Sequence, residues 1–116
     1  MKKLLILILG TMLSGAVLAS EVQNTKIIEV RSGPWYGTMV TFEVASTPSS
    51  QPTCSNMGDR GHYVFDTSNP GGGQWLSMVL SAHASGKTVQ VWGTGKCLDV
   101  HSNTLAGEEL ETIAIK

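Results

Sequence analysis

Two tryptophans and their polar neighbours give this sequence residue types that suit the binding of sugars. Trp35 and Tyr36 lie in a turn-forming stretch between Pro34 and Gly37, where large aromatic side chains are costly to expose unless something covers them. Sugar rings have apolar C–H faces that stack on aromatic rings, while amides, hydroxyls and carboxylates bond their hydroxyl groups. The predicted ligand-binding residues are Trp35, Tyr36, Thr41, Glu43, Gln90 and Trp92. Packing of Trp35 over one end of the core, and of Trp92 beneath a loop, stays open as the alternative.

A second pair of residues has the types that catalysis uses. Asp99 and His101 are two positions apart, so an extended chain would present both on one side. The sequence contains no nucleophile-elbow motif to supply a serine for them, so it predicts no catalytic residue and no enzyme, with a small hydrolase as the less favoured alternative. His62, His83 and His101 do not have metal-ligand spacing, and neither a metal nor a cofactor is expected.

Residues 1–19 have the parts of a secretory signal peptide. Lys2 and Lys3 precede an apolar run, and the segment ends in the small side chain of Ala19. The run is too short, and its flanks are wrong, for a membrane anchor. The sequence therefore predicts cleavage after Ala19, a single mature domain at 20–116, and a secreted or periplasmic location.

The charge of the mature domain excludes some classes of partner, and its cysteine content predicts a disulfide. Without Lys2 and Lys3, six of the eight basic side chains remain against nine acidic ones, which leaves a net charge of about −3. No basic cluster is present to meet phosphates, so nucleic acid is not an expected partner, and no later stretch is apolar enough to span a membrane. Cys54 and Cys97 are the only two cysteines, and in an oxidising compartment they are expected to form a disulfide.

The hydrophobic pattern predicts five short strands and one helix. The strands are expected at 26–31, 39–45, 62–67, 88–92 and 112–115, and the helix at 74–85. This order, β-β-β-α-β-β, is that of the OB-fold, a mainly β, five-stranded Greek-key barrel with one helix. The expected fold class is therefore an OB-fold-like barrel, although small α+β sheets share the same order of elements.

The predicted helix carries no charged residue. Between Thr67 and Gly86 there is no Asp, Glu, Lys or Arg, whereas a surface helix normally presents charges opposite its apolar stripe. Trp75, Leu76, Val79, Leu80 and His83 are expected to form that stripe. An uncharged face of small residues suits contact between copies of the chain, and Ser77, Ser81 and Ala84 are the predicted oligomer-interface residues. The alternative is a helix whose serines suffice for solvation in a monomer.

Three stretches carry a resemblance to known proteins. Residues 84–97 (ASGKTVQVWGTGKC), residues 65–67 (FDT) and Cys54 look like parts of small exported proteobacterial proteins of unassigned role. More distantly, the layout resembles the receptor-binding B subunits of subtilase-type and pertussis-like AB5 toxins. The shared points are the signal segment, the strand after Gly37, the helix ending at 85–87, and the strand that follows it.

Those B subunits are OB-folds that assemble as pentamers around their helices and bind sialylated glycans. The resemblance therefore implies an OB-fold, a homopentamer, and host or cell-surface glycans as partners, and it implies nothing about an exported A subunit. Two departures from the B-subunit pattern limit what the resemblance implies. A glycan-contacting serine of the subtilase-type subunits would fall near Tyr36, so that contact does not carry over, and the cysteine arrangement differs.

Together these observations predict a secreted, non-catalytic binding subunit that resembles an AB5 B subunit and binds glycans. The alternative from a different class is a monomeric periplasmic module that interacts with, or inhibits, a protein partner.

Overall fold

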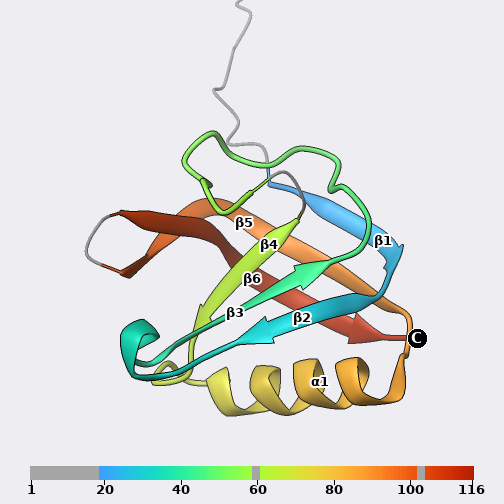
Figure 1. The fold of residues 1–116 in the computed structure, drawn as a ribbon. Coiled ribbons are helices and arrows are strands. Elements are labelled where there is room, and N and C mark those ends of the chain that lie inside the picture. The colour runs from blue at the N-terminus through green and yellow to red at the C-terminus, as the bar shows by residue number, and fades with distance from the viewer. Residues whose placement is uncertain (1–18, 59–60, 102–103) are drawn as a thin grey trace, which may run out of the picture.

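The computed structural model describes residues 19–58, 61–101 and 104–116 (Figure 1). Most of the predicted signal segment, residues 1–18, lies outside the described residues. The strands are β1 (Glu21–Thr25), β2 (Ile27–Arg31), β3 (Met39–Val44), β4 (His62–Asp66), β5 (Val89–His101) and β6 (Leu105–Ile115), with a 3-10 turn η1 (Pro34–Tyr36) and a helix α1 (Gly72–Ser85). The expected class, mainly β with one helix, is confirmed.

All six strands form one mixed sheet in the order β1-β5-β6-β4-β3-β2. Neighbouring strands are antiparallel except β4 and β6, which run parallel, with Tyr63 opposite Glu108. β5 and β6 form a long antiparallel pair whose end near His101 and Leu105 extends beyond the rest of the sheet (Figure 1). β1 and β2 lie at the two ends of this order, although only Lys26 separates them in the chain.

The sheet differs from the expected five-stranded barrel. It has six strands and is not a closed barrel, since β1 and β2 are not paired with each other among the described residues. The predicted strand at 26–31 is β2, and β1 was not predicted because its inward-facing residues include the polar Thr25 beside Val22. The last two strands are also much longer than the predicted 88–92 and 112–115.

The core lies between the concave side of the sheet and α1. Val40, Phe42 and Val44 alternate inward along β3, as the sequence pattern predicts, and all three are buried. From the helix, Val79 and Ala82 are buried against them. Ala82 lies outside the apolar stripe that the sequence pattern predicts, yet it is buried. Gly86 caps the helix in the left-handed region (φ 68°), and its N–H donates to the carbonyl of Ala82.

The predicted disulfide is present. Cys54 and Cys97 are joined with a Cα–Cα distance of 6.1 Å, and the bridge ties the loop between β3 and β4 to the middle of β5. That loop lies over the outer side of the sheet, where the Met57 thioether is close to Gly107 on β6. No helix in the described part of the chain is long and apolar enough to cross a membrane.

Candidate binding surface

An exposed tryptophan stacked on a histidine forms the clearest candidate site. Trp35, in η1, leaves 52% of its side chain exposed. One face of its indole stacks on the ring of His101 at the end of β5, with centroids 3.8 Å apart and planes inclined by 22°. Tyr36 meets the indole edge-on, at 5.2 Å and 86°. These three residues are called the aromatic platform below.

The platform is held from several sides. The His101 Nδ1 lies 3.1 Å from the carbonyl oxygen of Trp35, so the same two residues are joined through ring and backbone. Gly37 adopts a positive φ of 64° and donates its N–H to the Pro34 carbonyl, which closes the turn. A hydrogen bond with Tyr36, followed by the contact with Glu29, raises the pKa of Arg31 above its ordinary value. The exposed indole face is therefore presented in a fixed orientation.

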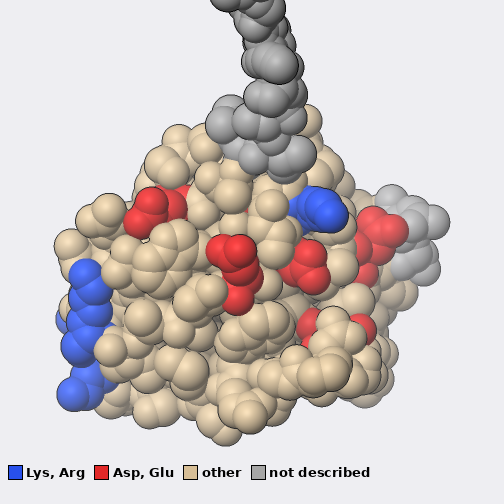
Figure 2. Space-filling model, turned by 180° about the vertical axis from the view of Figure 1, so that it is seen from behind, with Lys and Arg blue, Asp and Glu red and all other residues tan. Residues whose placement is uncertain are grey.

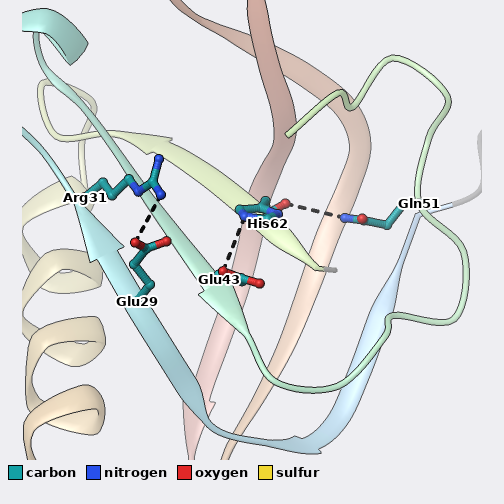
Figure 3. A network of polar contacts seen from close by, with 5 residues as sticks. All are labelled: Glu29, Arg31, Glu43, Gln51 and His62. Atoms are coloured by element: carbon teal, nitrogen blue, oxygen red, sulfur yellow. Dashed lines mark hydrogen bonds and ion pairs between the residues drawn. The ribbon is translucent and has the colours of Figure 1, made fainter. Parts of the chain in front are cut away.

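A row of charged and polar side chains crosses β2, β3 and β4 (Figure 3). At one end of this row, Arg31 forms a hydrogen bond with Tyr36 of the platform. Glu29 on β2 lies opposite Glu43 on β3, and each of these two carboxylates has its own nitrogen-bearing neighbour. Arg31 pairs with Glu29 at 3.1 Å, and the His62 Nε2 lies 3.6 Å from the Glu43 carboxylate. The amide of Gln51, from the bridged loop, donates to the His62 carbonyl at 3.4 Å. This polar row offers donors and acceptors beside the platform.

Of the predicted ligand-binding residues, Trp35, Tyr36 and Glu43 belong to this surface, whereas Thr41 does not. Thr41 lies opposite Arg31 on β3, but its side chain is only 1% exposed. Its register partner on β4, Val64, is also buried. The period-two pattern placed Thr41 outward, and the structure buries it because this part of the sheet is covered on both sides.

Gln90 and Trp92 lie on a different part of the sheet. Trp92 is half-buried opposite Glu21 in the β1–β5 pair, and the Gln90 amide donates to the Glu21 carboxylate at 3.2 Å. Nine positions along β5 separate Trp92 from His101, roughly 30 Å in an extended strand. The six predicted residues therefore do not form one site. Glu21 was missed because β1 was not predicted.

The residues considered for catalysis belong to the hairpin tip. Asp99 is exposed, and His101 stacks on Trp35 and contacts its carbonyl oxygen, which gives the imidazole a role in holding the platform. Within the ranges that the structure describes, no group of three or more His, Cys, Asp or Glu side chains is arranged to hold a metal ion, and no pocket is found. The candidate site is an open surface.

The outer side of α1 has an uncharged, partly apolar face. The predicted interface residues Ser77, Ser81 and Ala84 are all exposed. Leu80 lies among them at the same three- and four-residue spacing and is 48% exposed. The sequence pattern predicted that Leu80 faces the core, and this prediction is wrong. Seen from behind, basic side chains lie along the lower left edge and at one place near the top, acidic ones lie across the upper and middle parts, and the lowest part between the edges is uncharged (Figure 2). Ser77, Leu80, Ser81 and Ala84 are called the helix face below.

No model of a known protein family matches this chain, and no curated protein matches it. Its function is therefore inferred from the platform, the polar row and the helix face.

Proposed function

We propose that this protein is an exported, non-catalytic binding domain. Within that class, we propose that it acts as a glycan-binding subunit of the kind found in the B components of subtilase-type and pertussis-like AB5 toxins. The order of elements supports the comparison when β1 and β2 are counted as two halves of one bent strand interrupted at Lys26. One half pairs with β5 and the other with β3, and the order becomes the β-β-β-α-β-β of an OB-like Greek-key fold.

The observation that carries the proposal is the exposed indole of Trp35. Its contacts with His101 and Tyr36 already fix the ring, so a sugar that stacks on the free face would not have to order it. Arg31 contacts Tyr36 and pairs with Glu29, and both charged groups can bond sugar hydroxyls. The Arg31 guanidinium can also pair with an acidic sugar. Host or cell-surface glycans are the proposed partners.

The helix face supports assembly into a homo-oligomer, for which we propose a pentamer. Leu80 exposes apolar surface in the middle of a face without charges, and small residues on either side allow close approach of a second helix. A ring of identical platforms would raise the affinity for a glycan-bearing surface, because each further contact is made at a high effective concentration. Nothing in this chain assigns an A subunit.

Glycan-array retention of the purified protein tests the proposal. Trp35→Ala removes the stacking surface, and if stacking is worth about 1.5 kcal/mol, binding at one site weakens about tenfold. An assembled oligomer would amplify that loss. Ile28→Ala is the matched control, because Ile28 is also an exposed apolar residue but lies on β2 away from η1. Its retention should equal that of the wild type.

Trp92→Ala distinguishes the two tryptophans. We expect it to leave retention unchanged, since Trp92 lies far along β5 from the platform. Loss of retention in Trp92→Ala alone would move the sugar site to the β1–β5 surface. Wild-type protein that binds no glycan and elutes as a monomer would leave the monomeric protein-interaction or inhibitor module as the function to pursue.

A further inference from the structure

Glu108 on β6 is a fully buried carboxylate that takes no part in the proposed binding surface. Its side chain has 0% exposure. Its Oε2 accepts hydrogen bonds from the backbone N–H of Gly95 at 2.9 Å and from that of Ser20 at 3.1 Å. Its Oε1 accepts from the Ser20 hydroxyl, with the Gln51 amide 3.5 Å away. Every partner among these is a neutral group.

Within the described part of the chain, no lysine, arginine or histidine side chain pairs with this carboxylate. Among the described residues, Arg31 pairs with Glu29 and the His62 imidazole lies near Glu43, and neither contact involves Glu108. Tyr63 shares the Ser20 hydroxyl and stays a neutral phenol, because burial and the Glu108 charge outweigh that hydrogen bond and raise its pKa to about 12. A buried carboxylate without a counter-charge is strongly disfavoured. The fold thus holds both carboxyl oxygens of Glu108 in the interior, directly against the nitrogen and the hydroxyl of Ser20.

Ser20 is the residue that follows the predicted signal segment. We propose that cleavage between Ala19 and Ser20 supplies the missing cation, and that the new α-ammonium group of Ser20 forms a buried ion pair with Glu108. A signal-removing endopeptidase would add water across this peptide bond. The bond from the Ala19 carbonyl carbon to the Ser20 nitrogen breaks, the carbonyl carbon keeps the hydroxyl as a carboxylate, and the nitrogen takes up protons. A free α-amino group has an ordinary pKa of about 7.7–8, so it is charged at neutral pH.

The surroundings of Ser20 are shaped to hold a chain terminus. Ala19 is exposed whereas Ser20 is 1% exposed, so the chain enters the interior at the bond in question. The Ser20 carbonyl accepts a hydrogen bond from the Gly93 N–H at 3.0 Å, which fixes the residue at the start of β1. A Cβ on Gly93 would lie 2.1 Å from the Glu108 Oε2, so only glycine leaves room for the carboxylate at this place. Ser20, Glu108 and Gly93 together form the terminus site.

Periodate oxidation of the mature exported protein reads the state of this terminus directly. Periodate cleaves a serine whose amino group is free and unprotonated, so it reports both the identity of the terminus and its protection. In native protein we expect Ser20 to react at least about 100-fold more slowly than in urea-unfolded protein, because reaction requires opening of the site. Glu108→Gln should lose most of this protection. Glu109→Gln is the matched control, since the neighbouring Glu109 carboxylate contacts Thr94 and not Ser20.

A second comparison needs no change at Glu108. A chain that retains one alanine before Ser20 keeps the Ser20 N–H as an amide donor but moves the ammonium group away from the carboxylate. We expect its Tm at neutral pH to fall by at least about 5 °C relative to the chain that begins at Ser20. Equal Tm values for the two chains, native Ser20 that reacts as fast as unfolded Ser20, or a mature protein that starts at another residue would each overturn the proposal.

Discussion

Removal of the disulfide should reveal how much of the stability depends on covalent closure. The bridge joins positions 43 residues apart, and the chain-entropy relation gives about 4 kcal/mol for a loop of that length. The perturbation is the double substitution of Cys54 and Cys97 by alanine. Cys54 is exposed and Cys97 half-buried, so their replacement loses little packing and the entropic contribution dominates.

The position of the bridge explains where the loss should act. It holds the loop between β3 and β4 against β5, and this loop carries Gln51, which contacts both Glu108 and the His62 carbonyl. For a domain of this size, about 4 kcal/mol corresponds to a fall in Tm of roughly 15–30 °C. Local opening of the loop should accompany the global loss.

Urea unfolding followed by tryptophan fluorescence measures the free energy of unfolding with and without reductant. Reductant should destabilise the wild-type protein by about 4 kcal/mol and leave the alanine double variant unaffected. A loss below about 1 kcal/mol in protein shown by thiol titration to carry the bridge would refute the entropic reasoning. Free thiols in protein purified without reductant would refute the bridge itself.

Two further perturbations test the helix face and the buried tyrosine. In an assembled ring, Ser81→Glu would bring like charges together at a cost of several kcal/mol. Size-exclusion chromatography should therefore show a monomer, and circular dichroism should show that this monomer is folded like the wild type. Thr47→Glu, on an exposed loop, should assemble normally. Elution of Ser81→Glu with the wild type would exclude the helix face as the interface. Burial raises the pKa of Tyr63 from 10 to about 12. The neutral phenol therefore contributes on the order of 3 kcal/mol to the free energy of unfolding below pH 10, and this contribution is lost as the pH rises through 12. Alkaline titration of stability should therefore be flatter in Tyr63→Phe than in Tyr36→Phe, and equal slopes would contradict this assignment.

Much of the central sheet could be predicted because its physical signal is local. The alternation of Val40, Phe42 and Val44 marks a half-apolar strand, and the structure buries all three. β1 escaped prediction because it faces a polar part of the interior, where Ser20 meets Glu108 and Thr25 is buried. A period-two search for apolar residues does not detect such a strand.

The other misses arise from pairing between distant segments. Gly93 and Gly95 are typical of a turn, yet both lie within β5 because β6 and the terminus site hold this stretch extended, with irregular register. The partner of Trp35 in the platform is His101, 66 positions away, and no sequence spacing connects them. Leu80 followed helical spacing but faces outward, because Val79 and Ala82 fill the core-facing side.

The position of β6 in the sheet has a consequence for how the chain reaches its native state. β6 follows the other five strands in sequence, yet it lies between β5 and β4 in the middle of the sheet. The half made of β2, β3 and β4 and the half made of β1 and β5 are connected through it, with a parallel pair on one side. A chain that emerges from its N-terminus cannot join these halves until β6 has emerged too. The complete sheet therefore depends on β6 and on contacts between segments that are distant in sequence, which is typical of proteins that fold slowly.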